Sequence, residues 1–151
     1  MNPFSERALQ LALNNVEDGG HPFGAVLVCK GEIIAEGVNE RHLHPDVSGH
    51  AELVAIQKAQ VARGSMDLSD CTMYASGEPC PMCLTAMYFS NLKKVIYSQS
   101  VEDASCVGLT LSEKVYRDLE KPKDQREIKM IHEPIEDSEL DAMQAYATKK
   151  G

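Results

Sequence analysis

Residues 78–83 read Glu78-Pro79-Cys80-Pro81-Met82-Cys83, and they connect a short apolar run, Cys71–Ala75, to a helical pattern, Pro81–Phe89. Proline suits a first helical turn because its missing N–H is not needed there, so the helix is expected to begin at the first cysteine. Residues three apart lie on one face of a helix, which lets both sulfurs point at one ion. The positive end of a helix also favours the thiolate, the form of cysteine that binds metal. These residues therefore predict part of a metal site.

A second segment, Gly49-His50-Ala51-Glu52, begins another helical pattern that runs to about Ala62. One histidine and two cysteines supply three corners of a zinc tetrahedron and leave the fourth for water, which is typical of a catalytic site. Zinc lowers the pKa of such a water towards ~7. Glu52 would then stand beside that water and move its proton. We therefore predict one zinc ion per chain, with His50, Cys80 and Cys83 as ligands and Glu52 as the catalytic residue.

Two other kinds of protein use a Cys-x-x-Cys pair, and both stay open at this point. One is a redox protein, and the other is a non-catalytic zinc module that binds RNA or another protein. A non-catalytic module needs a fourth protein ligand or lacks the proton-carrying residue. Glu52 is present and no fourth ligand is evident in the sequence, so the pattern favours an enzyme.

The remaining periodicity predicts alternating helices and strands. Apolar residues at helical spacing predict a first helix over Pro3–Glu17, and polar residues 39–49 predict a loop. Further elements are predicted at the following positions: strands at Ala25–Cys29, Ile33–Val38, Lys94–Tyr97 and Ile128–Ile131, and helices at Ser112–Leu119 and Asp137–Lys149. This order predicts helices on both faces of a mixed sheet.

Length and charge limit the classes of protein to consider. A chain of 151 residues fits a single domain, here residues 1–151. It carries 23 acidic against 15 basic residues, a formal net charge of −8, which disfavours a long nucleic-acid partner and favours a small-molecule substrate. No stretch approaches the ~20 apolar residues of a membrane span. The odd count of five cysteines, without a secretion signal, argues against a disulfide framework. We therefore expect a cytoplasmic protein with no membrane partner.

The pair of motifs, His50-Ala51-Glu52 and Pro79-Cys80-Pro81-Met82-Cys83, resembles the signature of the cytidine-deaminase-like superfamily. The resemblance implies a three-layer α/β/α sandwich around a mixed five-stranded sheet, with zinc held between two helix N-termini. It also implies a zinc-dependent hydrolytic deaminase, which converts an amino-substituted nucleobase or related heterocycle to the oxo form and ammonia.

Within the superfamily the chain most resembles the bacterial guanine deaminases. The likeness includes Pro22-Phe23-Gly24-Ala25-Val26 and continues over nearly the whole chain. It implies that guanine or a similar aminopurine is the substrate and that the protein is a homodimer. By the same resemblance, the residues that contact the substrate are Asn39, Phe23, Ala51 and Asp103.

The chain departs from the guanine-deaminase pattern in two places. An acidic pair follows the Gly-aromatic step in that family, whereas Thr110 and Leu111 stand here. The family also ends in an aromatic tail that reaches a partner's active site, whereas this chain closes with Thr148-Lys149-Lys150-Gly151. A deaminase of cytosine, of another amino-pyrimidine or of a triazine therefore remains an alternative, as does a tRNA adenosine deaminase.

Overall fold

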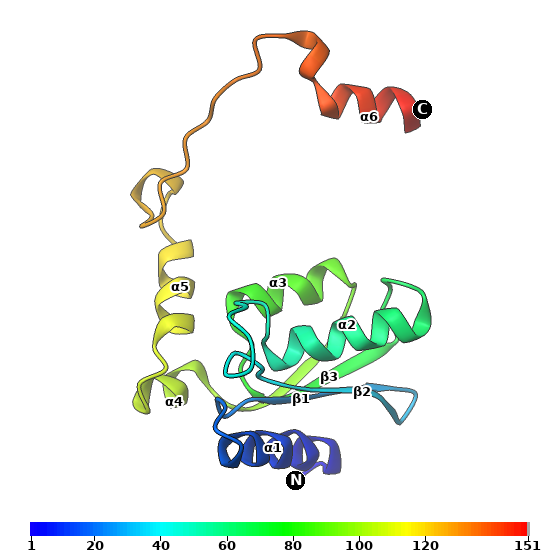
Figure 1. Cartoon of the computed structure of the whole chain (residues 1–151), viewed down its shortest axis with the longest axis vertical. Coiled ribbons are helices and arrows are strands. Elements are labelled where there is room, and N and C mark those ends of the chain that lie inside the picture. The colour runs from blue at the N-terminus through cyan, green and yellow to red at the C-terminus, as the bar shows by residue number, and fades with distance from the viewer. Residues whose placement is uncertain (151) are drawn as a thin grey trace. The chain divides into compact units, whose positions relative to one another are not determined.

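Four strands form one mixed sheet in the computed structural model, which describes residues 1–150 (Figure 1). They are β1 (Gly24–Cys29), β2 (Glu32–Val38), β3 (Cys71–Gly77) and β4 (Val95–Gln99), arranged in the order β2-β1-β3-β4. β1 runs antiparallel to both of its neighbours, while β3 and β4 are parallel. The strands expected at the hairpin and on either side of the Cys-x-x-Cys motif are therefore confirmed.

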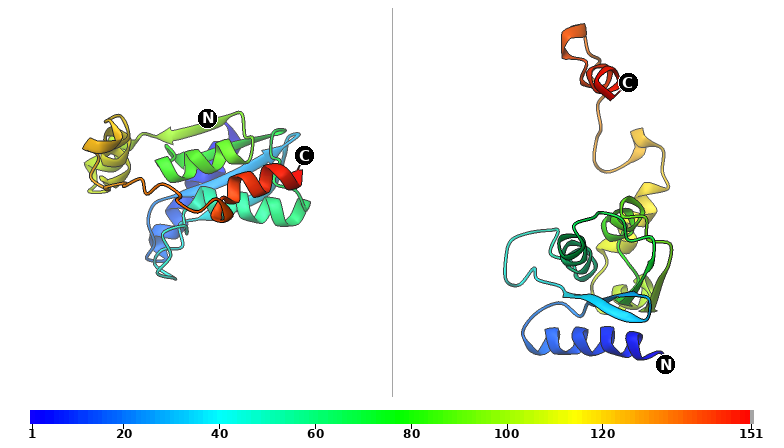
Figure 2. Two further views of the ribbon diagram at one scale, coloured as in Figure 1. Left: turned by 90° about the horizontal axis from the view of Figure 1, so that it is seen from above. Right: turned by 90° about the vertical axis from the view of Figure 1, so that its right-hand side faces the viewer.

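Helices cover both faces of this sheet, as Figure 2 shows in its right-hand view. α1 (Pro3–Glu17) packs on one face, while α2 (Ala51–Arg63) and α3 (Pro81–Phe89) lie on the other. Successive side chains of a strand point to opposite faces, so Val26 packs on the α1 side and Leu27 on the α2 side. The three-layer α/β/α arrangement is thus confirmed.

Small residues let both main helices approach the sheet closely. A Cβ atom at Gly37 in β2 would lie 2.2 Å from the carbonyl oxygen of Ala51, and one at Gly24 would lie 2.4 Å from that of Ala8. Non-bonded atoms do not approach one another this closely. Only glycine, which has no Cβ atom, therefore lets the helix backbones pack against the strands at these two positions. The contact at Gly37 fixes the first turn of α2, which carries His50 and Glu52.

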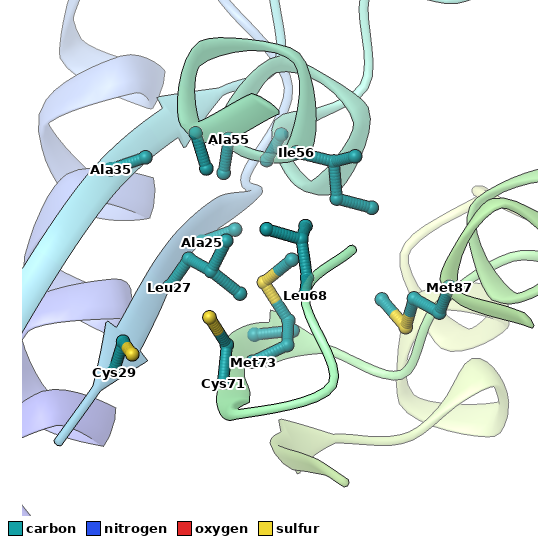
Figure 3. Packing of buried hydrophobic residues seen from close by; sticks show 13 residues of the cluster. Ala25, Leu27, Cys29, Ala35, Ala55, Ile56, Leu68, Cys71, Met73 and Met87 are labelled. Atoms are coloured by element: carbon teal, nitrogen blue, oxygen red, sulfur yellow. The ribbon is translucent and has the colours of Figure 1, made fainter. Parts of the chain in front are cut away.

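The larger part of the core lies between the sheet and α2 (Figure 3). Leu27, Leu68 and Met73 are fully buried there, and the alanines of α2 face them. Cys29 and Cys71 belong to the same cluster, as expected for cysteines in strands.

A short helix, α4 (Val101–Cys106), follows β4 and was not predicted. The side chain of Ser100 accepts a hydrogen bond from the N–H of Asp103, and the Asp103 carboxylate accepts one from the N–H of Ser100. This reciprocal capping box stabilises a helix start. α5 (Leu111–Leu119) follows within one residue of its expected start.

The chain divides into two compact units, with the boundary between Arg117 and Asp118. The second unit holds two short 3₁₀ turns, Lys123–Gln125 and Ser138–Leu140, and helix α6 (Ala142–Lys150). α6 begins later than expected, because the Asp137 carboxylate accepts a hydrogen bond from Glu139 N–H and starts a 3₁₀ turn instead.

The prediction of a fifth strand at residues 128–131 is wrong: this segment is irregular, and the sheet has four strands within residues 1–150. Ile128 and Ile131 are largely exposed. A strand requires hydrogen bonds to a neighbouring strand, and a short run of apolar residues does not reveal whether a neighbour is within reach. Among the described helices, none has both the length and the apolar character needed to cross a bilayer.

Candidate active site

Three ligand atoms converge between the start of α2 and the start of α3. Nδ1 of His50 lies 3.5 Å from Sγ of Cys80 and 3.6 Å from Sγ of Cys83. A tetrahedral zinc ion with ordinary Zn–N and Zn–S bonds holds such atoms roughly 3.6 Å apart. The donor set and its spacing therefore fit zinc without movement of the backbone, and Nδ1 is the histidine nitrogen placed to bind it.

Helix geometry explains why these residues meet. His50 and Cys80 occupy the N-cap positions of α2 and α3, and the backbone N–H of Cys83 donates a hydrogen bond to Sγ of Cys80 at 3.4 Å. Hydrogen bonds from the Cys83 thiol and from His50 lower the pKa of Cys80 to about 4, which keeps it a thiolate at neutral pH. The pKa of Cys83 is raised, because its thiol donates to that thiolate.

Glu52 lies in the first turn of α2 and is 6% exposed. Burial raises the pKa of its carboxyl to about 7, and Cys80 and Cys83 are among the groups that act on it. A carboxyl group with a pKa near neutrality can both accept and donate a proton, which is the property required of a general acid–base.

A pocket of about 590 Å³ opens beside the three ligand atoms, within the range of small-molecule sites. It is lined by segments that are far apart in sequence: residues 21–23, 39–50, 77–82 and 99–115 each contribute. Of the expected site residues, those that line it are Phe23, Asn39, His50, Cys80 and Asp103.

Asn39 is buried at the pocket wall, where its side-chain oxygen accepts a hydrogen bond from the N–H of Arg41 at 3.0 Å. Its backbone is held by Asn15 of α1, whose amide nitrogen donates to the carbonyl oxygens of Asn39 and His21 at 2.9 and 2.8 Å. Since the Asn39 oxygen already accepts one hydrogen bond, its amide N–H groups are the part that we expect to meet a ligand.

The other expected substrate contacts differ in their surroundings. Phe23 lines the pocket and packs closely over Gly77 at the end of β3. The carboxylate of Asp103 also reaches the pocket but is used in the capping box of α4. Ala51 is fully buried between His50 and Glu52, and its carbonyl lies against Gly37.

Sequence reasoning assigned no role to three residues around the site, although Glu78 stands in the quoted motif. Arg41 places a guanidinium at the pocket, and it follows the noted Asn39 by two positions. The Tyr116 hydroxyl donates to the carbonyl oxygen of Pro79 at 2.5 Å, and Glu78 accepts from the N–H of Val101 at 3.2 Å. Burial, with the acidic Glu78 nearby, raises the pKa of Tyr116 to about 12. These hydrogen bonds connect α4 and α5 to the Cys-x-x-Cys loop. No local sequence pattern predicts them.

Comparison with known proteins agrees with this geometry. Residues 2–99 match the model of the cytidine and deoxycytidylate deaminase zinc-binding region. The guanine deaminase of Bacillus subtilis is 41% identical over 97% of this chain and 96% of its own length. Its crystal structure aligns with a TM-score of 0.89, covering 98% of this chain and 95% of that one. The tRNA-specific adenosine deaminase of the same organism is 36% identical over 72% of this chain and 68% of its own.

Replacement of one sulfur ligand is expected to remove the metal. Cys83→Ala should reduce bound zinc from one per chain to a small fraction and lower the thermal stability, because the ion joins the starts of two helices. Zinc is measured by elemental mass spectrometry after gel filtration. Cys106→Ala, at an exposed cysteine of α4, is the matched control and should keep one zinc per chain. Full zinc content in Cys83→Ala would refute this ligand set.

Proposed function

We propose that this protein removes the amino group of guanine by hydrolysis and releases ammonia. The chain belongs to the family defined by the cytidine and deoxycytidylate deaminase zinc-binding region. The chain is a zinc-dependent hydrolase of C–N bonds in a nucleobase-type substrate. The observation that carries the proposal is the spacing of His50, Cys80 and Cys83 beside a pocket, with Glu52 buried in the adjacent turn.

His50, Cys80 and Cys83 would hold the zinc ion. When bound, zinc lowers the pKa of a water molecule from about 15.7 to about 7, which supplies a nucleophile at neutral pH. Glu52 accepts the proton of the attacking water and delivers it to a ring nitrogen of the base. It then carries a second proton to the amino group, which leaves as ammonia while the ring carbon keeps the oxygen.

The pocket walls would orient the base. Phe23, packed over Gly77, offers a flat apolar surface to a heterocyclic ring. Asn39 offers amide N–H groups to a ring nitrogen or carbonyl oxygen, because its own oxygen is engaged by Arg41. Arg41 adds a positive charge to the pocket. This charge favours a base with an electron-rich carbonyl group, such as guanine, over a positively charged substrate.

Guanine is preferred over other amino heterocycles because the similarity to a guanine deaminase extends over nearly the whole chain. The likeness to a tRNA-specific adenosine deaminase covers less of it, and the net charge of −8 is unfavourable for tRNA. Cytosine and amino-triazines can undergo the same reaction, so they are included as alternative substrates in the activity assay.

We also propose that residues 1–151 work as one deaminase domain in the cytoplasm. The first part of this proposal is supported by the alignment over 97% of the chain, which includes the second unit. The second part is supported by the ligand chemistry, because Cys80 and Cys83 bind zinc only as reduced thiolates.

A homodimer is proposed for the same protein. Tyr88 and Phe89 at the end of α3 are 76% and 77% exposed, and in the second unit Ile131 and Met143 are 89% and 82% exposed. Large apolar side chains of this kind are typical of surfaces that another subunit covers. Light scattering of the purified protein should give twice the mass of the chain, and the mass of a single chain at micromolar concentration would refute the dimer.

The function is tested by ammonia release from zinc-loaded protein with guanine, cytosine, adenine, their nucleosides and amino-triazines. Guanine should be turned over best, and Glu52→Gln should lose at least about a hundredfold in kcat while keeping one zinc per chain. Glu32→Gln, at an exposed carboxylate of β2, is the matched control and should retain full activity. Efficient turnover of another base with guanine inert would contradict the substrate, and an active Glu52→Gln would contradict the mechanism.

Leu111 is expected to limit guanine turnover, because it lines the pocket with an apolar side chain where the resemblance implies a carboxylate. An aspartate at this position could accept hydrogen bonds from the N–H groups of guanine. Leu111→Asp should therefore raise kcat/KM for guanine relative to the wild type, whereas Leu111→Asn, which has the same shape without the charge, should not. An unchanged or lower value in Leu111→Asp would assign substrate handling to other residues.

A further inference from the structure

A second pair of cysteines lies outside the zinc site, on the α2 face of the sheet (Figure 3). Cys29, the last residue of β1, is directly opposite Cys71, the first residue of β3, in an antiparallel ladder. Opposed residues in such a ladder have Cα atoms about 4.5–5.5 Å apart, which falls within the range that a disulfide requires. The two sulfurs and a carboxylate oxygen of Asp70 all lie within 4.8 Å of one another.

The groups around this pair are charged. Arg63, the last residue of α2, places Nη2 at 3.2 Å from Sγ of Cys29 and at 2.6 Å from Oδ2 of Asp70. The Cys29 thiol donates a hydrogen bond to the same carboxylate oxygen at 2.8 Å. A guanidinium beside a sulfur stabilises the thiolate, which is the reactive form of cysteine. The carboxylate of Asp70, whose pKa Arg63 lowers, stays ionised and holds the Cys29 thiol in place by accepting its hydrogen bond.

The two cysteines differ in reactivity. Burial raises the pKa of Cys71 to about 12, so this thiol remains protonated at neutral pH. Cys29 is the more exposed of the two, 8% against 4%, and it is the one in contact with the guanidinium. Cys29 is therefore placed to react first and Cys71 to resolve the product.

The same three side chains could also attract a thiophilic metal ion, but Arg63 opposes this. Its guanidinium donates to both carboxylate oxygens of Asp70, at 2.8 and 2.6 Å. A cation bound here would have to displace that ion pair and then sit next to the displaced positive charge. The arrangement is better suited to a dithiol than to a second metal site.

We propose that Cys29 and Cys71 form a redox-active dithiol, which a low-molecular-weight disulfide oxidises reversibly to a disulfide between β1 and β3. The Cys29 thiolate attacks one sulfur of the oxidant, forms a mixed disulfide and releases one thiolate. Cys71 gives its proton to that thiolate, attacks the Cys29 sulfur and expels the second thiolate, which takes up from solvent the proton that Cys29 released. In total, two protein thiols are oxidised and one external disulfide is reduced to two thiols.

Disulfide mapping of the zinc-loaded wild-type protein tests the proposal. The protein is equilibrated in glutathione buffers that become steadily more oxidising, then alkylated and digested. Digestion with trypsin and chymotrypsin, which cleave after Lys30, Arg63 and Tyr74, separates Cys29 and Cys71 from the zinc cysteines. The expected product is one pair of peptides joined through Cys29 and Cys71 and two hydrogens lighter than their sum. It should revert with dithiothreitol, and the zinc content should stay at one per chain.

Two outcomes would overturn the proposal. One is that Cys29 and Cys71 remain alkylated as thiols in the most oxidising buffer, while the exposed Cys106 forms a mixed disulfide with glutathione. The other is a second equivalent of zinc that is lost in the Cys29→Ala variant, which would assign the cluster to metal binding.

The role of Arg63 is tested by the rate of oxidation. Arg63→Met should slow disulfide formation about tenfold, because it removes the positive charge that lies 3.2 Å from the attacking Sγ of Cys29. Arg7→Met is the matched control: it removes a guanidinium that also donates twice to a carboxylate, that of Glu36, but contacts neither cysteine. An equal rate in both variants would show that the guanidinium does not activate Cys29. If Arg63→Met does not fold, the mapping of the wild-type protein still decides the main proposal.

Discussion

The structure depends on the meeting of two helix N-termini at one point. His50 and Cys80 stand at the N-caps of α2 and α3, where backbone N–H groups lack partners within the helix and the helix dipole is positive. The thiolate of Cys80 carries the negative charge that this position stabilises. The rest of the fold serves to hold the two helices there: Gly37 supports the first turn of α2, and β3 delivers the chain to the start of α3.

Sequence periodicity was sufficient wherever the pattern was local. The helices over Pro3–Glu17 and Pro81–Phe89 were predicted with their observed bounds, and the strands and the other helix beside the two zinc motifs were predicted to within two residues. It failed at residues 128–131, because strand formation depends on a partner strand that a local pattern cannot supply. The missed helix α4 had a signal, since Ser100 and Asp103 have the spacing of a capping box.

The convergence of His50, Cys80 and Cys83 could be predicted because each motif is short and its chemistry is specific. The pocket could not, because its walls come from four segments that only the fold brings together. Asn15 illustrates the difficulty: it reads as a polar residue near the end of a helix, yet its amide holds both His21 and Asn39 in place. Tyr116 acts in the same way on Pro79, over 37 positions of sequence.

The pocket has two walls of different origin. The wall that contains His50 and Cys80 is built on the starts of α2 and α3, and the first turn of α2 packs so closely on Gly37 that a Cβ atom there would collide with it. The second wall, residues 99–115, includes α4 and the start of α5, where side chains such as Leu111 are exposed. Mutations can therefore accumulate on the second wall without disturbing the first. A scaffold of this kind can acquire new substrates by drift in one segment, while the reaction that it performs is inherited unchanged.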